Sequence, residues 1–121
     1  MKRDHLVRLY DMLENIEAID EMVDGLNVSA FRADLRTSRA VERCLEIISE
    51  ASRTIPEDSK AQHPTTPWPE IAALGNLMRH EYQRVDSYLI WKIATRSLPE
   101  LRVVVKDLIS RAERDRNGRS S

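Results

Sequence analysis

The sequence predicts an all-α fold, an up-and-down bundle of about five helices. Apolar side chains recur at steps of three and four residues along most of the chain, which is the period of a helix with one buried face. Glycine makes up 3 of the 121 residues, too few for the turns of a β-sandwich or barrel. This length fits a single domain, which we expect at residues 1–116, followed by a frayed tail at 117–121.

The first predicted helix spans about Asp4–Val23, and Gly25 should end it. Its apolar side chains form a stripe that is wider than a single packing seam. A stripe of this width favours burial against a second chain, so we expect a homodimer. The stripe consists of Leu6, Val7, Leu9, Met12, Leu13, Ile16, Ile19, Met22 and Val23.

The second predicted helix, about Ala30–Thr54, ends before Pro56, because proline cannot donate a hydrogen bond in a helix interior. Residues 56–67 contain three prolines and should form a loop. Pro69 and the proline before it suit the first turn of a third helix that runs to about Tyr82, since the N–H that proline lacks would be unpaired there. The apolar stripe of the second helix comprises Phe31, Leu35, Val41, Leu45 and Ile48.

Two capping signals define the rest of the bundle. Asp86 can cap a short fourth helix that holds Leu89, Ile90 and Ile93. The segment Ser-Leu-Pro-Glu at 97–100 has the spacing of a capping box and should open a fifth helix. The apolar residues of that helix are Leu101, Val104, Val105, Leu108 and Ala112.

The composition excludes several classes of protein. The single cysteine, Cys44, rules out internal disulfides and a cysteine-only zinc site, and it is typical of a packed side chain in a reducing compartment. The longest apolar run, residues 103–105, is too short for a membrane span or a signal peptide. Nucleotide-binding glycine loops and zinc-protease motifs are absent from the sequence. We therefore expect a cytoplasmic protein that needs no metal or cofactor.

The net charge of −1 conceals an uneven distribution. Residues 1–24 carry three basic and seven acidic side chains, whereas residues 76–106 carry six basic and three acidic ones. The positive excess of the second segment fits a partner that carries phosphate, and it equally fits a dimer with complementary faces.

Among the three histidines, His80 is the candidate for chemistry, while His5 and His63 are expected at the surface. Asn76 and Arg84 lie one helical turn to either side of His80, so the three side chains share one face of the third helix. That face is opposite the predicted core residues Ile71, Leu74 and Met78. The alternative is an ordinary solvated helix face.

Four arginines in the second predicted helix fall on one edge, which could follow a phosphate backbone. They are Arg32, Arg36, Arg39 and Arg43. Glu46 and Glu50 continue the same edge, so a solvent face held by ion pairs is the alternative interpretation.

One segment, residues 68–86, reads Trp-Pro-Glu-Ile-Ala-Ala-Leu-Gly-Asn-Leu-Met-Arg-His-Glu-Tyr-Gln-Arg-Val-Asp. It resembles the signature of HepT-like HEPN proteins, which show a tryptophan, an isoleucine, then Arg-Asn-x-x-x-His-x-Tyr followed by Val-Asp. Four further segments also fit the family: 39–43, 47–51, 91–93 and 98–101. The resemblance covers about residues 5–112.

The resemblance implies a dimeric, metal-independent endoribonuclease whose Arg-x4–6-His motif lies at the dimer interface. Such proteins are often the toxin of a toxin–antitoxin pair, and the antitoxin is a small nucleotidyltransferase of the MNT type. In some pairs this partner silences the toxin by adding AMP to the motif tyrosine, which corresponds to Tyr82. An ideal helix would instead place Tyr82 near Met78, as a core residue.

A dimer makes chemical sense for this reaction. Cleavage of RNA by its own 2′-hydroxyl needs a base for the hydroxyl proton, an acid for the leaving 5′-oxygen and positive charge for the phosphorane. One chain offers only His80 in a suitable setting, whereas two chains bring two imidazoles to one cleft. Since the ordinary pKa of imidazole is about 6.5, one ring can be neutral and the other protonated near pH 7.

We therefore predict that His80 is the acid or base and that Asn76 orients it or a phosphate. Arg79 is the third predicted catalytic residue, and Arg84 and Arg43 are the candidates for binding the RNA; Arg79 or Arg84 would supply the positive charge at the phosphate. The chain departs from the signature at position 75, where glycine replaces the family's arginine. Loss of one transition-state donor costs about 2.7–4 kcal/mol, or roughly 10²–10³ in rate. The alternative function is therefore a catalytically weak or inactive module that binds a nucleotidyltransferase partner or a nucleotide.

Overall fold

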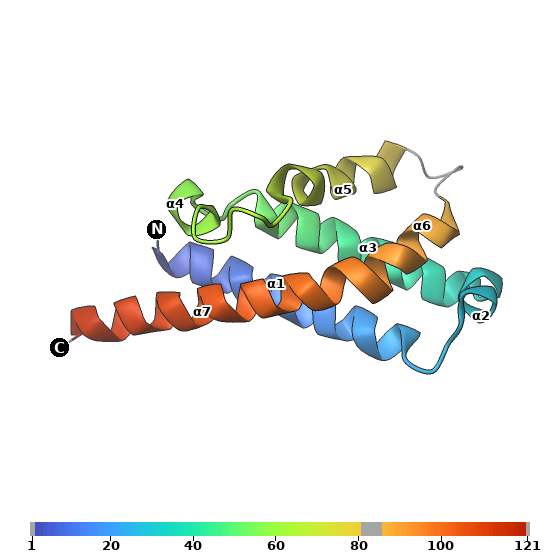
Figure 1. Ribbon diagram of the computed structural model, residues 1–121, viewed down its shortest axis with the longest axis horizontal. Helices are drawn as coiled ribbons and strands as arrows, with labels where there is room; N and C mark the ends of the chain where they lie inside the picture. The colour runs from blue at the N-terminus through green and yellow to red at the C-terminus, as the bar shows by residue number, and fades with distance from the viewer. Residues whose placement is uncertain (1, 81–85, 121) are drawn as a thin grey trace.

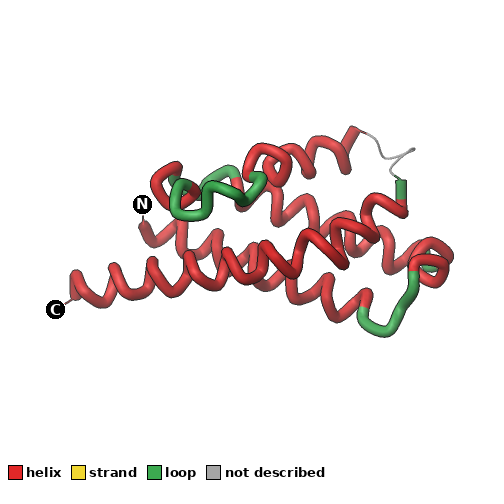
Figure 2. Tube along the Cα trace, viewed as in Figure 1, coloured by secondary structure: helices red, strands yellow, loops and turns green. Residues whose placement is uncertain are grey.

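The computed structural model describes residues 2–80 and 86–120. These residues are helical apart from short turns, and they contain no strand (Figure 2). The long helices α1 (Lys2–Val23), α3 (Leu35–Ser52) and α7 (Leu98–Ser120) run lengthwise beside one another, and α5 (Trp68–His80) lies along α3 (Figure 1). The predicted all-α bundle is confirmed. In the part of the chain that the structure describes, no helix has the length and apolar character needed to cross a membrane.

α1 packs against both α3 and α7, and this explains the breadth of its apolar stripe. Leu9, Met12 and Ile19 are completely buried within the single chain. Two intramolecular neighbours therefore use the stripe that suggested a second chain, and only Val7, 55% exposed, lies well outside the core. α1 ends as predicted at Gly25, whose φ of +78° lies in the left-handed region that glycine adopts most readily.

The predicted second helix is divided in two by Asp34. The helix α2 (Val28–Ala33) stops there, and the Asp34 carboxylate then caps α3 by accepting the Thr37 N–H at 3.1 Å and the Thr37 hydroxyl at 2.7 Å. The bend turns α2 so that Phe31 is completely buried, whereas Leu35, predicted to belong to the apolar stripe, is 65% exposed. Aspartate is a common cap at the start of a helix, but the apolar period continues through Asp34 and concealed this helix boundary.

The predicted loop before the third helix is present and contains one short helix, α4 (Glu57–Lys60). Trp68 anchors this loop, because its indole N–H donates to the carbonyl oxygens of Lys60 and His63, both at 3.2 Å. α5 begins at Trp68 with Pro69 in its first turn, as predicted. Its predicted end at Tyr82 falls outside the described residues.

The helix α6 (Ser87–Lys92) is capped by Asp86 as predicted, since the carboxylate accepts the Tyr88 N–H at 2.9 Å. α6 packs against α2. The ring centroids of Phe31 and Trp91 are 5.4 Å apart across this contact, which closes one end of the bundle.

The predicted capping box at 97–100 is wrong, because α6 and α7 form one continuous helix. They are joined by a π turn, η1 (Ile93–Ser97), in which the Leu98 N–H donates to the carbonyl oxygen of Ile93. Pro99 explains the wide turn: it lacks an N–H, and its ring would clash with the carbonyl one turn earlier in a regular α-helix. α7 is helical to Ser120, and a domain end at residue 116 stays a prediction.

Candidate functional site

α5 has one buried side and one exposed side. Ile71, Gly75 and Met78 are buried, whereas Asn76 is exposed, so the predicted separation of core and Asn76 is confirmed. The helix backbone places position 80 one turn beyond Asn76, and it is the last described residue of α5. Two other predicted site residues, Tyr82 and Arg84, lie outside the described residues.

Arg79 and His80 belong to the last described turn of α5. Their predicted roles rest on this backbone position alone.

α3 holds α5 through a buried serine. Ser49 is 1% exposed; its hydroxyl donates to the carbonyl oxygen of Ala72 at 2.9 Å and accepts the Gly75 N–H at 2.8 Å. The guanidinium Nε of Arg53 also donates to the Ala72 carbonyl, at 3.3 Å. Position 75, which carries arginine in the family signature, therefore faces α3 in this chain.

The arginines of the predicted basic edge are distributed differently from the prediction. Arg32 lies on α2 and donates through Nε to the Ser87 hydroxyl at 3.2 Å. Arg39 and Arg43 lie on α3 and pair with Glu42 at 3.6 Å and Glu46 at 3.5 Å. The alternative interpretation, a solvent face held by ion pairs, therefore applies to these two arginines. The Arg43 side chain is nevertheless 71% exposed.

Arg43 nevertheless lies at the same end of the helix pair as position 80. α3 and α5 run in opposite directions (Figure 1), and Ser49 marks where they touch, opposite Gly75. At a rise of 1.5 Å per residue, Arg43 is about 9 Å and position 80 about 7.5 Å from that contact, measured along each helix toward the same end. The tertiary structure thus brings one predicted RNA-binding residue level with the predicted acid–base residue.

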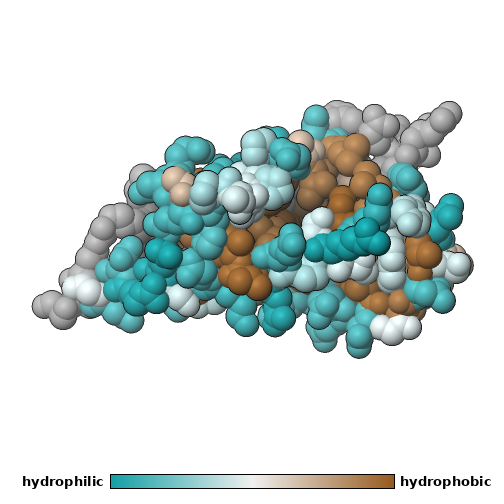
Figure 3. All heavy atoms as spheres, viewed as in Figure 1, coloured by the Kyte–Doolittle hydropathy of each residue, from teal (hydrophilic) through white to brown (hydrophobic). Residues whose placement is uncertain are grey.

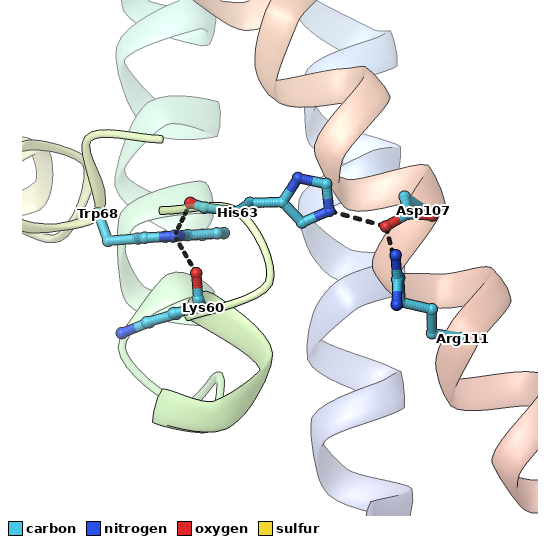
Figure 4. A network of polar contacts seen from close by, with 5 residues as sticks. All are labelled: Lys60, His63, Trp68, Asp107 and Arg111. Atoms are coloured by element: carbon cyan, nitrogen blue, oxygen red, sulfur yellow. Dashed lines mark hydrogen bonds and ion pairs between the residues drawn. The ribbon is translucent and has the colours of Figure 1, made fainter. Parts of the chain in front are cut away.

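A second polar cluster, at the other end of α5, involves a histidine that was expected at the surface. The His63 Nε2 lies 2.7 Å from an Asp107 oxygen that also accepts the Arg111 Nε at 2.7 Å (Figure 4). The Arg111 hydrogen bond, followed by that of His63, lowers the pKa of Asp107. The His63 side chain is 23% exposed, so it is a partly buried tie between the loop and α7. The partners are 44 positions apart in sequence, which is why the pattern gave no signal.

Cys44 and His5 are both partly buried. Cys44 is half-buried, and burial raises the pKa of its thiol, which fits the predicted packed cysteine better than a nucleophile. His5 is half-buried near the start of α1, where burial lowers its pKa and the Asp58 carboxylate partly opposes this effect.

Apolar surface gathers over α5 and in the hollow between α5 and α7 (Figure 3). The half-buried side chains of α5 include Leu74 and Leu77. In the described part of the chain α5 packs chiefly on α3, whereas α1 packs on both α3 and α7, so the surface of α5 is the less covered of the two.

Comparison with known proteins places this arrangement in a family. The model of the ribonuclease HepT-like family matches residues 12–108, which include α3, α5 and the helices that hold them. The chain belongs to the HepT-like family. The predicted resemblance is therefore confirmed.

Several known proteins resemble the chain over most of its length. A Thermococcus cleftensis protein named "Probable ribonuclease HepT" is 41% identical over 102 residues, which cover 84% of this chain and 93% of the relative. A Methanocaldococcus jannaschii protein provisionally named an RNase is 36% identical over 105 residues, covering 87% and 96%. A Caldanaerobacter subterraneus protein with a similar provisional name is 34% identical over 103 residues, covering 85% and 92%. No solved structure matches the chain significantly.

Proposed function

We propose that this HepT-like protein is a metal-independent endoribonuclease that cleaves RNA as a homodimer. The observation that carries the proposal is α5, which exposes Asn76 and reaches His80 one turn later in a chain whose relatives are named ribonucleases. Arg43, level with His80 on α3, adds an exposed cation for the RNA phosphates.

In the proposed reaction, a neutral His80 removes the proton from a ribose 2′-hydroxyl. The 2′-oxygen then attacks the adjacent phosphorus, and the bond from phosphorus to the 5′-oxygen breaks. A protonated His80 of the second copy gives its proton to the leaving oxygen. The products are a 2′,3′-cyclic phosphate and a 5′-hydroxyl, and Arg79, Arg84 and Arg43 supply positive charge to the phosphorane.

The homodimer is proposed on this chemistry and on the apolar flank of α5, because the stripe of α1 is already used within the chain. A second copy that covered Leu74 and Leu77 would bring the two α5 helices together. Light scattering at micromolar concentration should give about 28 kDa, twice the chain mass of 14.0 kDa. A monomer throughout that range would contradict the shared cleft.

We further propose that the protein is the toxin of a pair whose antitoxin is an MNT-type nucleotidyltransferase, which controls it through AMP on Tyr82. The added phosphate would occupy the positive site for RNA and repel the substrate backbone. Incubation with the cognate partner and ATP should add one AMP to the intact mass, and Tyr82→Phe should abolish the addition. An unchanged mass with an active partner would contradict this control.

The catalytic proposal is tested by comparing two histidine variants. His80→Ala should lower the cleavage of single-stranded RNA by about 10²–10⁴. His63→Ala is the matched control, because His63 ties the loop to α7 and has no role in the proposed reaction. EDTA should leave the wild-type rate unchanged. Activity that survives His80→Ala, or that requires added divalent metal, would overturn the mechanism.

A specific observation favours the alternative of a weak or inactive binding module. Gly75 is buried against Ser49, so this position offers no guanidinium to the exposed face of α5. If the wild type binds the nucleotidyltransferase or a nucleotide but leaves RNA intact, the binding module is the correct function.

A further inference from the structure

Ser49 differs from Ser52, the other buried serine near the end of α3, in where its hydrogen bonds go. Serine and threonine within helices usually bond to the carbonyl one turn earlier in their own helix. Ser52 does so, donating to the Ser49 carbonyl at 2.7 Å. The Ser49 hydroxyl instead crosses to α5, where it donates to Ala72 and accepts from Gly75. Two bonds of opposite polarity therefore join one buried atom to the backbone of the neighbouring helix.

These two bonds restrict both sliding and rotation of α5. Ala72 and Gly75 are three residues apart, so they lie on one edge of α5 about 4.5 Å apart along its axis. A slide of α5 along α3 would lengthen one of the bonds to Ser49, and a rotation would turn the edge away from the hydroxyl. Because Gly75 has no side chain, its backbone can approach Ser49 closely.

The anchored edge is directly coupled to the candidate site. Asn76 immediately follows Gly75, and position 80 lies about 7.5 Å from Gly75 along the axis of the same helix. The intervening residues are helical without interruption. A displacement of α5 at the Ser49 contact would therefore move Asn76 and His80 by a similar distance relative to Arg43, which is fixed on α3.

We propose that Ser49 is a positioning residue, which sets the place of the Asn76–His80 segment relative to α3. The inference rests on the proposed ribonuclease function, since the segment matters only if it acts on RNA. The Ser49 hydroxyl does not touch the substrate. It fixes the helix that carries the reacting groups, and a misplacement of about 1 Å lowers a reaction rate by as much as about 10²-fold.

Ser49→Ala removes the two bonds while leaving α5 able to fold. The Ala72 carbonyl and the Gly75 N–H can still form the bonds of their own helix, so neither group is left unpaired. Ser49→Cys is a second variant that preserves the size of the side chain but replaces the hydroxyl by a weak donor. Ser52→Ala is the matched control, because Ser52 is equally buried at 1% exposure and bonds only within α3.

The first readout is single-turnover cleavage of a short single-stranded RNA, with binding followed by fluorescence anisotropy. We expect Ser49→Ala and Ser49→Cys to lower the cleavage rate by about 10–100-fold with RNA affinity within about twofold. Ser52→Ala should retain the wild-type rate within about twofold. The same rate loss in Ser52→Ala, or full activity in Ser49→Ala, would overturn the positioning role.

The second readout does not depend on activity. In Ser49→Ala the Gly75 amide should exchange with solvent about tenfold faster, and the ring resonances of His80 should shift, whereas Ser52→Ala should change neither. If the wild type does not cleave RNA, the proposed function fails, and these measurements still decide whether Ser49 positions the segment. Unchanged Gly75 exchange and unchanged His80 resonances in Ser49→Ala would refute the inference.

Discussion

Replacing Asp107 by asparagine should loosen the loop before α5 from α7. One Asp107 oxygen accepts from both His63 and Arg111, each at 2.7 Å, and the substitution removes its negative charge with little change of shape (Figure 4). The His63 bond is the tertiary one, because it joins the loop to α7. The Arg111 bond connects residues four apart on a single helix.

The expected loss of stability is modest because the cluster is partly exposed. The side chains of Asp107 and Arg111 are 35% and 46% exposed, so solvent screens their ion pair. An exposed ion pair at this spacing on a helix is worth about 0.3–0.5 kcal/mol, and the partly exposed hydrogen bond from His63 about 0.5–1 kcal/mol. The variant should therefore lose about 0.5–1.5 kcal/mol, which lowers the melting temperature by roughly 2–6 °C for a domain of this size.

The pH dependence of this loss has a definite sign. Hydrogen bonds from Arg111 and His63 hold the pKa of Asp107 below its ordinary value, so the carboxylate stabilises the fold above the unfolded-state pKa of about 3.9. This contribution disappears as the pH falls through the lower pKa of the folded state. The difference in unfolding free energy between wild type and variant should thus still be present at pH 5 and shrink below about pH 4 as Asp107 is protonated.

Urea unfolding at a series of pH values measures this difference. Asp115→Asn, on the exposed end of the same helix, is the control and should change stability by less than about 0.5 kcal/mol. A loss above about 3 kcal/mol would mean that the cluster behaves as a buried network. A difference that persists undiminished well below the Asp107 pKa would refute the electrostatic reasoning.

Three other experiments test the packing, the backbone and the thiol. Phe31→Ala should cost about 3–5 kcal/mol in urea unfolding, because the ring is completely buried, while Leu35→Ala, 65% exposed, should cost less than about 0.5 kcal/mol; equal losses would contradict the division at Asp34. Gly25→Ala should destabilise by about 1 kcal/mol owing to its positive φ, and Gly118→Ala, within a helix, should be neutral or stabilising in thermal melts. Burial raises the pKa of Cys44, so its alkylation by iodoacetamide should be slower at pH 8 than that of glutathione; a faster reaction would point to an activated thiol.

The sequence predicted those features that depend on residues within one or two helical turns. The end of α1 just before Gly25, the Asp86 cap of α6 and the place of Pro69 in the first turn of α5 were all expected. Each is decided by a side chain and the backbone groups beside it, so no information from the rest of the chain is needed. The exposure of Asn76 opposite the core face of α5 followed from the same local periodicity.

Local sequence patterns gave wrong predictions where two patterns overlapped or where tertiary packing decided the structure. The apolar period continued through Asp34 and concealed the cap that divides α2 from α3, and a capping-box spacing concealed the π turn before Pro99. The width of the α1 stripe suggested a second chain, although α3 and α7 together account for it. The periodicity of a helix shows which of its faces is buried, but it does not show which neighbour covers that face.

The candidate site divides in the same way. The sequence by itself identified α5, its exposed Asn76 and the position of His80, because one helix contains them all. Only the tertiary structure brought Arg43 level with position 80, tied His63 to Asp107 and aimed the Ser49 hydroxyl at Gly75. The Ser49–Gly75 and His63–Asp107 contacts join residues separated by 26 and 44 positions. Their geometry is fixed by how the helices pack rather than by the spacing of residues along the chain.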